Sequence, residues 1–106
     1  MGTRCNELDA AVTNERKRRI AHWRSIARAE LIKLPEVQSE VVNFLGKRIS
    51  FTTFRELHDG RLLILVRSDR PRYFGIVTYG ATDGFWVSPD GKLADVSDKD
   101  VLDFFS

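Results

Sequence analysis

The first third of the chain places its apolar residues at helical spacing. Residues 6–33 contain neither Pro nor Gly. From Leu8 to Leu34 apolar side chains recur at intervals near 3.6 residues, which is typical of one face of an amphipathic helix; they are Leu8, Val12, Ile20, Trp23, Ile26, Ala27, Leu31 and Leu34. Arg16 and Arg19 interrupt this face, and Thr13 or Asn14 can cap a fresh start. The pattern therefore predicts one long helix or two in tandem.

A second helix is predicted between Pro35 and Gly46. Pro is well placed in the first turn of a helix, and Gly is common just after the last turn. The apolar residues between them are spaced to form one helical face: Val37, Val41, Phe44 and Leu45. Together with the preceding segment, this helix would make an N-terminal helical hairpin.

After Gly46 the period of the pattern changes to two. Ile49, Phe51 and Thr53 alternate with polar residues, and Asp59-Gly60 marks a tight turn before an apolar strand. Further turns are predicted at 68–71, 80–84 and 89–91, separating strands at 73–79, 85–88 and 92–94. The result is an antiparallel meander of four or five strands.

The end of the chain carries a helix signal. Ser97 and Asp100 have the spacing of a capping box, and apolar residues follow them. The predicted fold class is α+β, with an N-terminal helical hairpin packed on a four- to five-stranded antiparallel meander sheet and a short C-terminal helix. Residues 1–106 form one domain, in which residues 1–14 are frayed or serve as an oligomerisation arm. The residues expected in the core are Trp23, Val41, Leu45, Leu63, Leu65, Phe74, Ile76 and Phe104.

The segment 50–57 admits a second interpretation. Capped by Ser50, it can form a short helix with Phe51, Phe54 and Leu57 on one face, giving the helix order of a winged helix-turn-helix. Its Ile, Phe and Thr content favours the strand. The stretch 53–77 also resembles Phd-type antitoxins in its Phe-Arg-Glu-Leu, Asp-Gly, Leu-Leu-Ile-Leu-Val-Arg and Arg-Pro elements, over about a quarter of the chain. This resemblance assigns no role to any residue.

Composition excludes several kinds of site. Cys5 is the only cysteine, so neither an internal disulfide nor a cysteine-cluster zinc site can form. The glycines are scattered over separate turns, and no serine has the frame of a nucleophile elbow. We expect no cofactor and no metal, and a binding protein rather than an enzyme. The longest apolar run has five residues and the N-terminus lacks an apolar signal region, so a cytoplasmic location without membrane contact is expected.

Charge is distributed unevenly along the chain, although the net charge is only +2. Residues 1–34 carry eight Lys or Arg against four Asp or Glu, whereas residues 83–106 carry two against six. Lys17, Arg24 and Arg28 form a basic row beside the apolar helical face. The row can bind phosphates or an acidic protein, or pair with the acidic C-terminal segment.

A second basic cluster has aromatic residues beside it, as in sheets that stack nucleic-acid bases. It comprises Arg67, Arg70, Arg72 and Tyr73. These features leave three functional hypotheses open. The first is a small non-enzymatic binding protein that acts through protein-protein interaction, including self-association as a homodimer. The others are a nucleic-acid-binding regulator, and a small-ligand-binding domain or enzyme with a pocket between helices and sheet.

Overall fold

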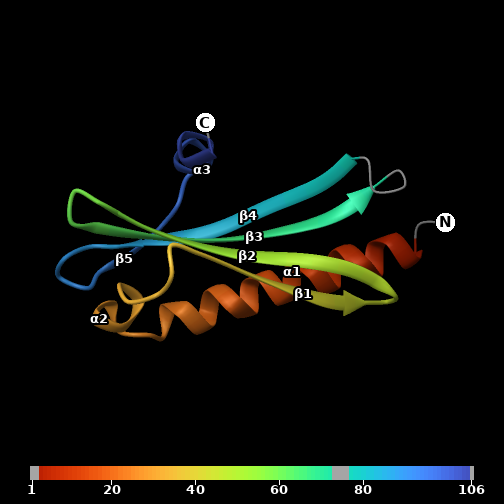
Figure 1. Cartoon of the computed structure of the whole chain (residues 1–106), viewed down its shortest axis with the longest axis horizontal. Helices are drawn as coiled ribbons and strands as arrows, with labels where there is room; N and C mark the ends of the chain where they lie inside the picture. The colour runs from red at the N-terminus through yellow and green to blue at the C-terminus, as the bar shows by residue number, and fades with distance from the viewer. Residues whose placement is uncertain (1–2, 73–76, 106) are drawn as a thin grey trace.

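The protein is a five-stranded antiparallel sheet with helices on both faces (Figure 1). This computed structural model describes the backbone of residues 3–72 and 77–105, and the side chains of residues 7–69 and 80–105. The strands follow the chain order β1-β2-β3-β4-β5. The elements are α1 (Thr3–Arg24), α2 (Arg28–Leu31), β1 (Val37–Phe44), β2 (Lys47–His58), β3 (Arg61–Arg72), β4 (Val77–Val87), β5 (Leu93–Asp95) and α3 (Asp98–Phe105). The predicted α+β class, meander and C-terminal helix are confirmed.

The N-terminal helix α1 lies along one face of the sheet (Figure 1). It runs without a break through Thr13, so this segment forms the single long helix and not the alternative of a fresh start at Thr13 or Asn14. Its end is marked by Ser25, whose hydroxyl donates to the His22 carbonyl, and the single turn α2 follows. Val12 is buried against Ile49 and Phe51 of β2. Val12, with Leu8 packed beside the same cluster, therefore contributes to the core, while the role of residues 1–14 as an oligomerisation arm stays a prediction.

The helix predicted between Pro35 and Gly46 was wrong, because residues 37–44 form the edge strand β1. Its even-numbered residues face α1, and Val42 and Phe44 pack there on the cluster around Phe51. Val41 and Leu45, which were predicted in the core, are exposed. Three valines and a phenylalanine in eight residues favour a strand over a helix, and this preference prevailed.

Two-residue turns set the register of the first two hairpins. The four turn residues have positive φ angles between 50° and 81°; they are Leu45 and Gly46 in the first turn, and Asp59 and Gly60 in the second. Such backbone belongs to the type I′ turns whose twist matches that of the flanking strands. The predicted turn at Asp59-Gly60 is confirmed, and the unpredicted one at Leu45-Gly46 joins β1 to β2.

Strands β3 and β4 run through two segments that were predicted as connections. Residues 68–71 belong to β3 and pair with residues 78–81, and residues 80–84 belong to β4 and pair with residues 65–69. Gly80 and Gly84 are strand glycines at points where another part of the chain comes close, rather than turn residues. The Gly, Ser, Asp and Pro residues in segments 68–71 and 80–84 explain why these segments resemble turns in sequence. The chain reversal itself lies outside the described residues.

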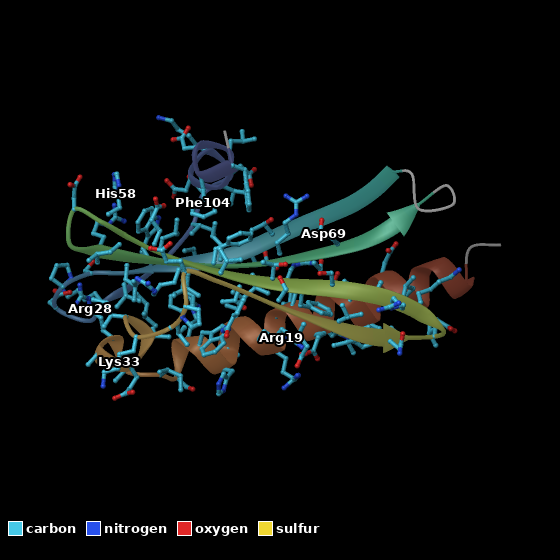
Figure 2. The ribbon with its side chains drawn as sticks, viewed as in Figure 1. Arg19, Arg28, Lys33, His58, Asp69 and Phe104 are labelled. Carbon is cyan, nitrogen blue, oxygen red and sulfur yellow. The ribbon has the colours of Figure 1, made fainter. Side chains whose placement is uncertain are left out.

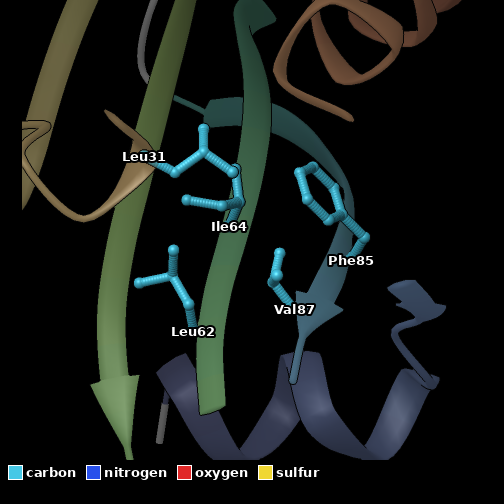
Figure 3. Close-up of a cluster of buried hydrophobic side chains, with 5 residues drawn as sticks. All are labelled: Leu31, Leu62, Ile64, Phe85 and Val87. Atoms are coloured by element: carbon cyan, nitrogen blue, oxygen red, sulfur yellow. The ribbon is translucent and has the colours of Figure 1, made fainter. Parts of the chain in front are cut away.

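The buried residues form a layer on each face of the sheet. On the α1 face, Leu31 of α2 packs with side chains from β3 and β4 (Figure 3): Leu62, Ile64, Phe85 and Val87. On the opposite face Leu63, Leu65 and Trp86 pack under α3. Burial of Leu63 and Leu65 confirms the core prediction, whereas Trp23 and Phe104 are only partly buried. Phe74 and Ile76 lie outside the described residues.

The C-terminal helix α3 begins as its sequence predicts. The Asp100 amide donates to the Ser97 hydroxyl at 3.1 Å, and the Ser97 amide donates to the Asp100 carboxylate at 3.0 Å. This reciprocal pair is a capping box with Asp in place of Glu. Segment 50–57 is part of strand β2, so the helical reader required by the winged-helix interpretation does not form. No helix in the described part of the chain is long and apolar enough to cross a membrane.

Candidate protein-binding edge

Two members of the basic row bind within the chain. Arg24 Nη2 lies 2.6 Å from Asp95 Oδ1, and Arg28 Nη2 donates to the Gly60 carbonyl at 2.8 Å. The first contact joins α1 to the acidic C-terminal segment, which was one of the three roles considered for the row. Lys17 lines a hollow of about 410 Å³ between α1, β4 and β5. Figure 2 shows Arg28 and Arg19 on the helix side of the sheet and Phe104 on the other side.

The small-ligand hypothesis expects a pocket between helices and sheet, and this hollow is one of those that lie between α1 and the sheet. Arg24 and Asp95 line it and pair with each other, and Asp83 on its wall accepts a hydrogen bond from Arg16 at 2.6 Å. Arg16 also donates to the buried Ser68 hydroxyl. Three charged side chains that line the hollow, Arg24, Asp83 and Asp95, are therefore paired within the chain. Among the described residues, no group of three His, Cys, Asp or Glu is placed to hold a metal ion.

The second basic cluster is only partly described. Arg67 Nε donates to both carboxylate oxygens of Asp69, at 2.8 and 3.0 Å, and its guanidinium lies 5.2 Å from the Phe105 ring. Arg70 and Arg72 belong to β3, but their side chains are not among those described. Tyr73 lies outside the described residues. Of the four predicted residues, Arg67 is therefore the one whose side chain the structure describes.

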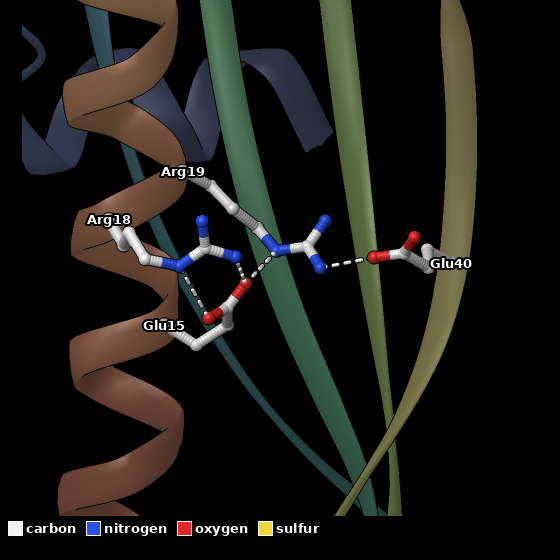
Figure 4. A network of polar contacts seen from close by, with 4 residues as sticks. All are labelled: Glu15, Arg18, Arg19 and Glu40. Carbon is white, nitrogen blue, oxygen red and sulfur yellow. Dashed lines mark hydrogen bonds and ion pairs between the residues drawn. The ribbon is translucent and has the colours of Figure 1, made fainter.

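A charge network that the sequence did not reveal ties α1 to β1 (Figure 4). Glu15 accepts hydrogen bonds from Arg18 at 2.9 Å and from Arg19 at 2.7 Å. These bonds, that from Arg18 above all, lower the pKa of Glu15. Arg19 also pairs with Glu40 of β1 and lies 4.6 Å from the Phe51 ring. The one charge on β1 is therefore neutralised by the helix.

The outer edge of β1 is open. Within the described residues β1 pairs only with β2. The Arg55 amide donates to the Glu36 carbonyl, and antiparallel residues alternate in direction, so even-numbered residues of this segment bond to β2. The odd-numbered residues of β1 then turn their backbone N–H and C=O groups outward: Val37, Ser39, Val41 and Asn43. Eight residues of strand thus present a free backbone edge.

The side chains along this edge do not protect it. Native proteins guard open edges with Lys, Pro, bulges or covering elements. β1 contains no Lys, Arg or Pro, and its pairing with β2 is continuous from Val37 to Phe44. Val37, Val41 and Leu45 are 57%, 53% and 47% exposed, respectively. The edge therefore combines unpaired backbone groups with exposed apolar side chains.

The opposite edge of the sheet offers a poorer surface. β5 pairs only with Phe85, Trp86 and Val87, so β4 is uncovered from Gly84 back to Val77. Glycine is unfavourable in strands, and this edge includes both Gly80 and Gly84. Its described part also carries none of the exposed large apolar side chains.

A further polar hollow lies beside α3. Arg61 stacks 4.2 Å from the Trp86 ring, and Trp86 Nε1 donates to Asp100 at 3.1 Å. Hydrogen bonds from the Ser97 backbone and from Trp86, with the charge of Arg61, lower the pKa of Asp100. These contacts hold α3 on the sheet, which gives the residues a structural role.

Comparison of the chain with family models, curated proteins and solved structures found no match. The candidate site is therefore defined by geometry alone, and its central feature is the β1 edge.

Proposed function

We propose that this protein is a small non-enzymatic binding protein of the cytoplasm that acts through protein-protein interaction at the outer edge of β1. The observation that carries the proposal is the open, unguarded edge with three exposed apolar side chains. Sheet edges bind extended segments through backbone hydrogen bonds, while alternate side chains provide specificity. Here the side chains beside an added strand would be Val37 and Val41 on one face and Glu40 on the other.

The rigidity of β1 supports this function. Arg19 pairs with Glu40, and Val42 and Phe44 pack on the α1 face. The strand is therefore already ordered on the sheet without a partner. A preformed edge loses little conformational freedom on binding, which favours affinity. The nucleic-acid hypothesis receives less support, because segment 50–57 is a strand and Arg24 and Arg28 bind within the chain.

Site-specific photocrosslinking in cells tests this function. A benzophenone amino acid at Val37 should link the protein to another polypeptide, which can be a second copy. The same group at exposed Lys92, in the β4–β5 turn, should not. Val41→Pro should abolish the Val37 adduct, since proline removes an N–H that β2 does not use. Val41→Thr, which keeps the N–H and the branched shape, should preserve it.

Circular dichroism of both Val41 variants must first match that of the wild type, and Asn43→Pro provides a second edge block. Absence of any Val37 adduct, or an adduct that survives both proline variants, would contradict the proposed function.

A further inference from the structure

We infer that the partner at this edge is a second copy of the same chain, paired antiparallel with β1 so that Val41 lies opposite Val41 of the other copy. The inference rests on the proposed function and specifies its partner. Isologous pairing of one edge with itself closes as a two-fold dimer and joins two five-stranded sheets into one. It would also cover an edge that each copy leaves open.

The backbone of β1 meets the geometric requirement for self-pairing. In an antiparallel pair, directly opposite residues must both turn their N–H and C=O groups toward the partner to exchange two hydrogen bonds. Val41 does so in both copies, and Ser39 would exchange the same bonds with Asn43 of the second copy. The central Val41 pair and the two symmetry-related Ser39–Asn43 pairs together supply about six hydrogen bonds.

The exposed apolar side chains favour this register over one shifted by two residues. With Val41 opposite itself, Val37 comes beside Leu45 of the second copy, so all three exposed apolar residues of the edge meet apolar neighbours. The adjacent register, shifted by two residues, places Val41 opposite Ser39 and Val37 opposite Asn43. That arrangement leaves each exposed valine beside a polar side chain.

The charge of Glu40 also favours the register with Val41 opposite Val41. In the Val41-centred register, Glu40 lies opposite Val42 of the second copy. In the shifted register Glu40 lies directly opposite Glu40, and like charges in that position are unfavourable. Each Glu40 is paired with Arg19 of its own chain, but its side chain is 62% exposed, so the pairing reduces this repulsion without removing it. The helices α1 and α3 pack on the two faces of the sheet, and β1 is the outermost strand at its edge.

Disulfide mapping tests both the partner and the register, in a Cys5→Ser background that removes the native thiol. Opposite residues that exchange hydrogen bonds have Cα atoms about 5.5 Å apart, within the range that a disulfide spans. Under mild oxidation Val41→Cys should form a covalent dimer rapidly. Ser39→Cys, at a similarly exposed site two residues away, should not link to itself, but should link to Asn43→Cys when the two proteins are mixed.

Sedimentation equilibrium of the wild-type chain over a concentration series complements the mapping. A shift from monomer to dimer that Val41→Pro abolishes and Val41→Thr retains is the expected result. A wild-type monomer at every concentration, or equal crosslinking of Val41→Cys and Ser39→Cys with themselves, would overturn the inference. Such a result would not by itself overturn the proposed function, because a Val37 photoadduct to a different protein would still support binding at this edge.

Discussion

Gly84 is the position where the addition of one methyl group should be most damaging. A Cβ there would lie 2.3 Å from the Ile64 carbonyl oxygen and 2.5 Å from Leu65 Cδ2. Gly80 in the same strand is a matched control. A Cβ there would lie 2.6 Å from Arg67 Nη2 and 2.7 Å from Asp69 Oδ1, which are ends of flexible side chains. Only the clash at Gly84 involves backbone.

The expected magnitudes follow from this difference. Relieving a 2.3 Å contact with a backbone oxygen requires β3 and β4 to separate locally by about 1 Å, and overpacking of this kind costs about 1–3 kcal/mol or more. A Gly→Ala change recovers about 0.4–1 kcal/mol by restricting the unfolded chain. A contact this short with backbone belongs at the upper end of that cost, so we expect Gly84→Ala to lower the free energy of unfolding by about 2 kcal/mol net. Gly80→Ala should change it by less than about 1 kcal/mol, because displacing the Arg67–Asp69 pair loses little.

Urea unfolding followed by tryptophan fluorescence measures both variants, with Trp86 two residues from Gly84 as a buried reporter. A loss of about 2 kcal/mol is a large part of the roughly 5–15 kcal/mol expected for a domain. Equal stability of the two variants would refute the reasoning, since the β3–β4 spacing would then not be as close as the structure has it.

The remaining predictions concern the core, α3 and the basic row. Leu65→Ala should lower the free energy of unfolding by about 2–5 kcal/mol in the same assay, since Leu65 is fully buried; a change below about 0.5 kcal/mol would contradict its place in the core. The folded-state pKa of Asp100 is lowered, so its contribution is present above the unfolded pKa near 3.9 and is lost as pH falls through the folded value. Acid titration monitored by circular dichroism should destabilise the wild type more than Asp100→Asn, and parallel curves would contradict this. Replacing Lys17, Arg24 and Arg28 with Gln should lower stability slightly at low salt and less at high salt, because exposed pairs are screened. Wild-type binding to duplex DNA below about micromolar at physiological salt would show instead that the row contacts phosphates.

Local chemistry was the part of the fold that the sequence predicted well. Asp59-Gly60 and the Ser97/Asp100 capping box depend on a few adjacent residues, and both formed as expected. The helix prediction for segment 35–46 was wrong because Pro and Gly at its ends, with apolar residues four apart, resemble the boundaries and apolar face of a helix. A strand signal was also present in its three valines and one phenylalanine among residues 37–44, of which Val42 and Phe44 face α1.

The candidate site was missed for the same reason. A helix over residues 37–44 would place Val41 in the core and would leave no open sheet edge. The close approach at Gly84 and the pairing of Arg19 with Glu40 depend on residues that are 20 or more positions apart, so no local pattern reveals them. The Val content of β1 was the signal that could have found the edge.

Amide hydrogen exchange at β1, measured residue by residue by NMR at low and high protein concentration, tests the central claim most directly. The outward amides of Ser39, Val41 and Asn43 should exchange quickly in dilute protein and become protected as concentration rises. The inward amides of Glu40 and Val42, which bond to β2, should be protected at both concentrations and serve as the internal control. Outward amides that exchange at the same rate at every concentration would contradict self-pairing at the β1 edge.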